Sequence, residues 1–257
     1  MSAQRRLQGW TGRRLTPGEA LGLPLTVGMA LVLIGGWAFG HVADNVIERD
    51  DLTARDSAVT AWLVDHRTGW LTATMRAVTM LGGFWLAVPL VVAVALLLPR
   101  PWGRARTVAF VVTVTVGTSL LVNAVKVLIA RPRPTLTDVI ATANGYAFPS
   151  GHTGQAVAAY GALAYLIGQR LPARCRPAVW AGAAAIAMLV GFSRLYLGVH
   201  WLTDVIGGLL IGAVWLASAL TAVVAFNDAR LAARDRLARW RRVPEVSSRH
   251  PPRGRVG

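Results

Sequence analysis

Charged residues and cysteine are scarce in this chain of 257 residues, and each shortage narrows the class of protein. Only 15% of the residues are charged, against about 25% in soluble domains, while 54% are hydrophobic. So few charges cannot cover a soluble surface, and so many apolar residues exceed the needs of one core. The single cysteine, Cys175, excludes an internal disulfide, and we interpret it as incidental. The composition predicts a single-domain polytopic membrane protein.

Lysine and acidic residues are also rare, because Lys126 is the only lysine and 12 acidic residues stand against 26 arginines. The resulting formal net charge of +15 could indicate a nucleic-acid-binding protein. The basic residues instead occupy short gaps between apolar runs. We therefore predict a lipid bilayer as the partner of this chain, and no nucleic acid.

Apolar runs dominate the sequence, and a membrane-spanning helix needs about 20 mostly apolar residues. Residues 53–80 differ, because tryptophan, leucine and methionine alternate there with charged residues. That pattern predicts one or two amphipathic helices near the membrane interface. The predicted fold is therefore an all-α polytopic membrane helical bundle with six transmembrane helices plus interfacial amphipathic helices. The six predicted spans are residues 21–43, 82–99, 107–129, 153–169, 177–193 and 202–226.

The distribution of basic residues predicts the orientation of these spans, since Lys and Arg collect on the cytoplasmic side. With the N-terminus inside, 19 of the 27 basic residues fall in cytoplasmic segments. We predict a multi-pass protein of the plasma membrane with both termini in the cytoplasm. The first span is interpreted as retained, because no short apolar stretch with a cleavage site precedes it. Residues 1–228 form the predicted membrane domain, and residues 229–257 a basic cytoplasmic tail that is partly disordered.

Basic residues on the predicted outer side need another explanation, because the charge rule disfavours them there. They are Lys126, Arg131, Arg133 and Arg194. Each alone could be an interface anchor whose side chain reaches the headgroups. Lys126, Arg133 and Arg194 together require an anion, and the nearby loops offer only Asp138 and Asp204. Because a guanidinium group forks well onto phosphate oxygens, we expect an external anion as the better partner.

The segment Phe148-Pro-Ser-Gly-His152 is typical of a helix start on the same predicted side. Ser150 is a good N-cap, and Gly151 lets a backbone N–H group approach a ligand closely. The unpaired N–H groups and partial positive charge of a helix N-terminus suit phosphate. Alone, such a segment is more often an ordinary helix cap. His152 would lie in the first turn, beside this anion site.

His200 and Asp204 stand four residues apart, so a helix would place both on one face, about 6 Å apart along the axis. A carboxylate there can accept a hydrogen bond from one imidazole nitrogen and leave the other with a free lone pair. That is the orienting half of a nucleophilic site. A buried pair with a structural function fits the spacing equally well.

Taken together, the clusters resemble the three signature motifs of the type 2 phosphatidic acid phosphatase superfamily. They read Lys-x6-Arg-Pro from Lys126, Pro-Ser-Gly-His from Pro149 and Ser-Arg-x5-His-x3-Asp from Ser193, and all match in full and in order. The resemblance covers residues 126–204, and the six-span layout extends it over most of the chain. The superfamily also holds soluble acid phosphatases and vanadium haloperoxidases. The spans favour its membrane lipid-phosphatase branch, which includes phosphatidylglycerophosphatase B and polyprenyl diphosphate phosphatases.

The resemblance implies a phosphatase that acts through a phosphohistidine intermediate, without a cofactor. His200 would attack phosphorus, Asp204 would orient His200, and His152 would protonate the leaving group and then activate water. No Cys, His or carboxylate set stands at metal-ligand spacing, so we predict no metal. The phosphoryl oxygens would be bound by Lys126, Arg133, Ser150, Gly151 and Arg194.

Other classes of function fit the sequence less well. A non-catalytic anion-binding or transport protein could use the basic cluster, but the spans carry essentially no deep ionisable residues. A binding or scaffolding protein with a degenerate site would be expected to lack His152, His200 or Asp204, and all three are present. The substrate stays open between a polyprenyl diphosphate carrier, phosphatidylglycerol phosphate, phosphatidic acid and a polyprenyl phosphoribose phosphate. The active site is expected to face the outside of the cell.

Overall fold

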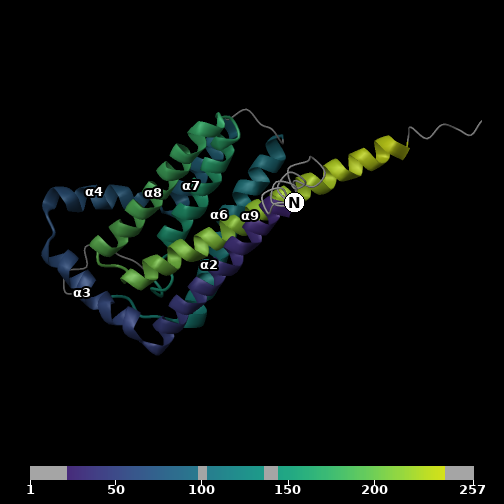
Figure 1. The fold of residues 1–257 in the computed structure, drawn as a ribbon. Coiled ribbons are helices and arrows are strands. Elements are labelled where there is room, and N and C mark those ends of the chain that lie inside the picture. The colour runs from purple at the N-terminus through teal and green to yellow at the C-terminus, as the bar shows by residue number, and fades with distance from the viewer. Residues whose placement is uncertain (1–21, 98–102, 136–143, 241–257) are drawn as a thin grey trace, which may run out of the picture. The chain divides into compact units, whose positions relative to one another are not determined.

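The computed structural model describes residues 22–97, 103–135 and 144–240, and all regular structure within these ranges is helical (Figure 1). The all-α prediction is therefore confirmed. Asp138, the first 21 residues and the last 17 lie outside the described residues. The helices are α2 (Gly22–Glu48), α3 (Asp51–Asp65), α4 (Gly69–Met80), α5 (Phe84–Leu97), α6 (Arg104–Ile129), α7 (Gly151–Gly168), the short 3-10 helix η1 (Ala173–Cys175), α8 (Arg176–Tyr196) and α9 (Leu202–Trp240).

The chain divides into two compact units. The smaller unit joins residues 1–25 to residues 222–257, and its described part consists of the beginning of α2 and the end of α9. The larger unit, Thr26–Thr221, contains all three polar clusters. All of the predicted site residues therefore belong to the larger unit.

Four helices in the described ranges are long and apolar enough to cross a membrane, which confirms a multi-pass protein. They are Leu23–Glu48, Arg104–Ile129, Ala173–Tyr196 and Leu202–Asn227. A fifth crossing is available only if α4 and α5 act together, and they are bent by 59° at their junction. The reason is length, since the 14 residues of α5 extend about 21 Å while a bilayer core is about 30 Å thick. The predicted count of six spans is thus approximate.

Helix α7 corresponds to the remaining predicted span, and it is buried by protein along most of its length. It packs against α5, α6 and α8, and Figure 1 shows α6, α7 and α8 side by side. A small residue also lets α9 come close to α7, because a Cβ on Gly161 would lie 2.2 Å from the Leu216 side chain of α9. Its neighbours take the place of lipid, so α7 can be less apolar than the outer helices.

Helix α3 is not a free surface helix, because one of its faces packs against the protein. Asp56, Thr60 and Leu63 are buried, and their spacing of four and three residues places them on one side of the helix. Leu63 packs with Leu195 of α8 and Val205 of α9. The predicted amphipathic helix is therefore present, but its buried face carries a carboxylate.

Two backbone contacts bring the polar clusters together at one end of the larger unit. The Ser150 N–H donates to the Asp204 carbonyl over 2.8 Å, and the Ala147 N–H donates to the Arg131 carbonyl over 2.9 Å. A Cβ on Gly208 would lie 2.6 Å from the Ser150 carbonyl oxygen, so α9 begins close against the start of α7. The ends of α6 and α8 meet the starts of α7 and α9 in this region.

Candidate active site

The beginning of α7 has the features expected of an anion site, with one difference in detail. Ser150 is the N-cap residue, but its side chain makes no capping bond to the backbone. Its hydroxyl oxygen instead accepts a hydrogen bond from Thr153 Oγ1 over 3.0 Å. The Cβ of an alanine at Gly151 would lie 4.0 Å from Lys126 Cε, so the lysine stem passes over this helix start.

His200 and Asp204 form the predicted pair, although His200 precedes α9 and does not lie on it. Nδ1 of His200 lies 3.2 Å from Oδ2 of Asp204, and the same oxygen accepts the Trp201 N–H over 2.9 Å. If Nδ1 carries the proton, Nε2 holds a free lone pair. Burial lowers the pKa of His200 to about 4, against the opposing effect of Asp204, so the imidazole is neutral near pH 7.

The free nitrogen of His200 faces Arg133. Arg133 Nη1 lies 3.2 Å from His200 Nε2 and also donates to the Val199 carbonyl over 2.7 Å. Burial lowers the pKa of Arg133 from its ordinary value, yet an arginine remains charged near pH 7. Arg133 and Lys126 both donate to the Tyr146 carbonyl, so these two cations converge beside the imidazole.

Arg194 reaches the same region from the last turn of α8 and is only 5% exposed. Its Nη1 donates to Thr79 Oγ1 over 2.8 Å, while its buried Nε has no hydrogen-bond partner among the described residues. A buried donor of this kind requires an explanation, and a bound anion would supply one.

The glycine turn that follows α4 touches His152. A Cβ on Gly82 would lie 2.7 Å from the His152 carbonyl oxygen, and one on Gly83 would lie 3.9 Å from His152 Nε2. The end of α4 therefore contacts both His152 and Arg194, the latter through Thr79. No local pattern in the sequence predicts this contribution from α4.

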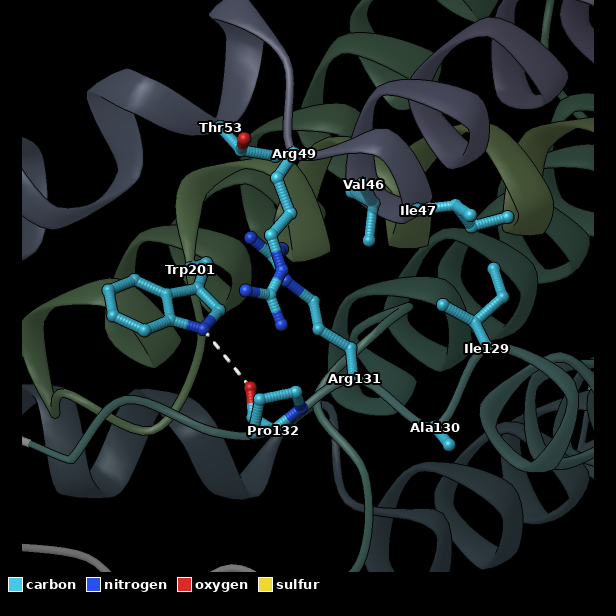
Figure 2. A pocket seen from close by; sticks show the side chains of 9 residues that line it. All are labelled: Val46, Ile47, Arg49, Thr53, Ile129, Ala130, Arg131, Pro132 and Trp201. Atoms are coloured by element: carbon cyan, nitrogen blue, oxygen red, sulfur yellow. Dashed lines mark hydrogen bonds between the residues drawn. The ribbon is translucent and has the colours of Figure 1, made fainter.

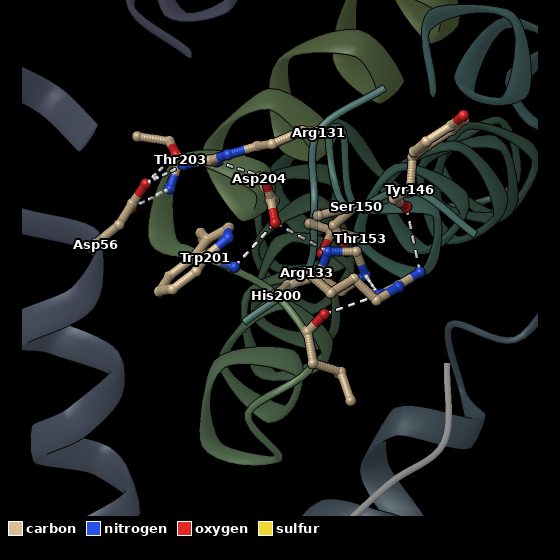
Figure 3. A network of polar contacts seen from close by, with 12 residues as sticks. Asp56, Arg131, Arg133, Tyr146, Ser150, Thr153, His200, Trp201, Thr203 and Asp204 are labelled. Atoms are coloured by element: carbon tan, nitrogen blue, oxygen red, sulfur yellow. Dashed lines mark hydrogen bonds and ion pairs between the residues drawn. The ribbon is translucent and has the colours of Figure 1, made fainter. Parts of the chain in front are cut away.

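A network of buried side chains behind Asp204 was also missed (Figure 3). Arg131 lies between two carboxylates, with Nη1 2.6 Å from Asp204 Oδ1 and Nη2 2.7 Å from Asp56 Oδ2. Asp56 also accepts hydrogen bonds from the backbone and the hydroxyl of Thr203. These two carboxylates explain why Arg131 lies on the predicted outer side, because its anions belong to the protein. Asp56 is 75 residues distant in sequence, and no local spacing points to it.

A cavity of about 490 Å³ lies beside this network and is open to the side chains of Arg49, Arg131 and Trp201 (Figure 2). Trp201 Nε1 donates to the Pro132 carbonyl over 3.2 Å, and the Arg131 guanidinium stacks 5.8 Å from the Trp201 ring centre. None of the eight predicted site residues lines it. The cavity therefore borders Arg131 and its neighbours, which hold Asp204, and it is separate from the predicted phosphate position.

The described ranges hold no group of three His, Cys or carboxylate side chains placed to bind a metal ion. Metal independence stays a prediction. The site instead brings together a histidine that is neutral near pH 7, a carboxylate and several cations, a set of groups that suits the binding of a phosphate ester.

The helical fold and this set of side chains indicate a class, the membrane phosphatases. Comparison with known proteins gives the family. The family model of the PAP2 superfamily matches residues 106–228. Phosphatidylglycerophosphatase B of Bacillus subtilis (strain 168) is 33% identical over 172 residues, which are 65% of this chain and 82% of that protein. The chain belongs to the PAP2 superfamily.

Solved structures agree with this assignment. The crystal structure of a transmembrane PAP2 type phosphatidylglycerolphosphate phosphatase from Bacillus subtilis matches with a TM-score of 0.67 and 29% identity, covering 77% of this chain and 96% of that one. The structure of Aquifex aeolicus LpxE matches with a TM-score of 0.50 at 22% identity, over 64% of this chain and 94% of that one, which shows a shared fold. The predicted family, helical class and phosphatase class are confirmed, while the individual residue roles stay predictions.

Proposed function

We propose that this chain hydrolyses a lipid phosphate by way of a phosphohistidine formed on His200. The observation that carries the proposal is the placement of the two imidazole nitrogens. Nδ1 faces Asp204 at 3.2 Å, and Nε2 faces the Arg133 guanidinium at 3.2 Å. The proposed attacking nitrogen therefore lies next to a cation that can bind the phosphate.

Phosphate would replace main-chain oxygens as the ligand of the two convergent cations. Lys126 and Arg133 bind neutral carbonyls in the segment 144–147. A phosphate group offers negatively charged oxygens, which attract a lysine or arginine side chain more strongly than neutral carbonyl oxygens do. Arg194, Ser150 and the Gly151 N–H would complete the contacts to the phosphoryl oxygens.

The reaction would then proceed in two displacements. His200 Nε2 attacks phosphorus as the bond to the leaving oxygen breaks, and His152, which the negative charge of the bound phosphate holds in its protonated form, gives that oxygen a proton. Asp204 stabilises the imidazolium that carries the phosphoryl group. His152 next takes a proton from water, whose oxygen attacks phosphorus, and the N–P bond breaks to release phosphate and neutral His200. Fixed positive charge in the site lowers both barriers.

A lipid is the proposed substrate class because the site lies where helices of membrane-spanning length begin and end. A lipid can reach such a site by lateral movement, with its chains still in the bilayer. Burying the chains contributes about 0.8 kcal/mol per methylene, which a water-soluble ester lacks. Phosphatidylglycerol phosphate is favoured among the open candidates, because a relative 33% identical over 172 residues is a phosphatidylglycerophosphatase. A polyprenyl diphosphate is the second candidate of this class.

The experiment is phosphate release by the purified protein in proteoliposomes against a panel of these lipids and a soluble sugar phosphate. We expect a much higher kcat/KM for a long-chain lipid phosphate, and no turnover by His200→Ala. Equal or better kcat/KM for the sugar phosphate would refute the lipid assignment. Full activity of a folded His200→Ala protein would refute the nucleophile.

The orientation of the site is a separate part of the proposal. The excess of arginine in the predicted inner segments supports cytoplasmic termini and an outward-facing site in the plasma membrane. A reporter fused after Gly257 should be active in the cytoplasm, and one inserted near Gly145 should be active outside. The reverse pattern would place the chemistry on the inner side.

A further inference from the structure

Arg131 makes a bridge that the phosphatase motifs do not require. One of its terminal nitrogens binds Asp204 and the other binds Asp56, so a single guanidinium joins the partner of the nucleophile to helix α3 (Figure 3). Both carboxylates are at least 97% buried as side chains, and the Arg131 side chain is 12% exposed. A buried bridge of this kind costs desolvation energy, so its presence requires a reason beyond stability.

The contacts leave the Asp204 carboxylate little freedom to rotate. Its Oδ1 accepts from Arg131, and its Oδ2 faces His200 Nδ1 and accepts the Trp201 N–H. If Arg131 swung away, Oδ1 would lose its charged partner and the carboxylate could turn. The imidazole would then lose the contact that fixes its proton on Nδ1.

Asp56 prevents that swing. It binds Arg131 Nη2 through Oδ2, while Oδ1 accepts the Thr203 N–H over 2.9 Å. Thr203 is the residue immediately before Asp204, so Asp56 fixes both the guanidinium and the backbone that carries the catalytic carboxylate. Asp56 itself is 2% exposed and lies on the packed face of α3.

We propose that Asp56 and Arg131 are positioning residues that hold Asp204, and through it His200, in the orientation for attack. The proposal extends the His–Asp pair to a chain of four side chains, His200, Asp204, Arg131 and Asp56. It rests on the proposed function. Among the described residues, no hydrogen bond or ion pair joins the side chain of Asp56 or Arg131 to the phosphate-binding residues, so altering these side chains should affect chemistry and leave substrate binding intact.

The single variants test the direction of the effect. We expect Asp56→Asn and Arg131→Lys each to lower kcat by about 10- to 100-fold, the range seen when outer partners of metal-binding histidines are removed, with KM unchanged within about twofold. Lysine keeps the charge but has one nitrogen and cannot bridge two carboxylates in this geometry. Asp65→Asn is the matched control, because Asp65 is an exposed acid on the same helix. It should retain wild-type kcat.

A second background separates positioning from a general structural effect. In an Asp204→Asn protein the carboxylate that Arg131 holds is already absent. Adding Asp56→Asn should then reduce the residual kcat, measured with radiolabelled lipid phosphate, by less than about twofold. Thermal unfolding of each purified variant shows which of them are folded, and Arg131→Lys serves if Asp56→Asn does not fold.

The proposal is supported if Asp56→Asn lowers kcat at constant KM in the wild-type background and has no such effect in the Asp204→Asn background. A full further loss in that background, a raised KM at unchanged kcat, or wild-type kinetics of Asp56→Asn would overturn it. Lack of phosphatase activity in the wild-type chain would instead refute the proposed function.

Discussion

The attacking nitrogen proposed for His200 lies 3.2 Å from Arg133 Nη1, while the opposite ring nitrogen lies 3.2 Å from Asp204 Oδ2. The imidazole is thus held between an anion on one side and a cation on the other. The cation is where phosphate oxygens would bind, and the anion is where the positive charge of the phosphorylated ring would be stabilised. This arrangement leads to specific expectations for variants and conditions.

Replacing the second histidine should affect both halves of the reaction. His152→Ala removes the proposed acid of the first displacement and the proposed base of the second, a loss of about 10²- to 10⁴-fold for general acid–base catalysis. With a leaving group that needs no proton, the first step should recover and the second should not. Rapid-quench measurements should then show phosphoenzyme accumulating in His152→Ala. Equal slowing with good and poor leaving groups would argue against the assigned acid.

The acid limb of the pH profile should lie unusually low. Burial lowers the pKa of His200 from 6.5 to about 4, and the neutral form is the nucleophile. Activity should therefore persist as pH falls through 6.5 and be lost only as it falls through about 4. The measurement is kcat/KM in the free-enzyme regime, corrected for ionisation of the substrate phosphate, with activity rechecked after return to pH 7. A reversible limb near pH 6.5 would contradict a buried, neutral His200.

Chelators should leave the activity intact if Lys126, Arg133 and Arg194 supply the positive charge. Vanadate should inhibit, because it adopts the five-coordinate geometry of the displacement and can bind to the imidazole. Replacing Arg133 by alanine should weaken vanadate inhibition at least tenfold, since one charged contact to an anion is removed. Loss of activity with a chelator, restored by one divalent ion, would point to metal-assisted hydrolysis.

Much of the fold was accessible from sequence, because apolar length and arginine placement are local properties. Four predicted spans coincide with long apolar helices, and the residues of the three motifs fall at helix ends. The bent junction of α4 and α5 was not predicted, since residues 69–80 include Arg76 and three threonines and belong to the stretch that the sequence assigns to interfacial helices. His200 was placed on a helix by its spacing to Asp204, but the helix begins two residues later at Leu202.

The buried contacts that hold Asp204 and Arg194 in place could not be predicted in the same way. Asp56 lies in a segment that sequence assigns to the membrane surface, and its partner Arg131 is 75 residues away. Burial of Asp56 depends on α3 packing against α8 and α9, which is a tertiary contact without a local signature. Likewise, Thr79 binds Arg194 only because the end of α4 lies against α8.

Direct detection of a phosphorylated His200 is the sharpest test of the account. The purified protein would be mixed with a ³²P-labelled lipid phosphate, quenched in alkali, where phosphohistidine survives, and digested for peptide mapping by mass spectrometry. We predict label on the peptide that contains His200, retained in a His66→Ala control at an exposed histidine and absent from His200→Ala. Label on another residue, or turnover in folded His200→Ala protein, would contradict the mechanism.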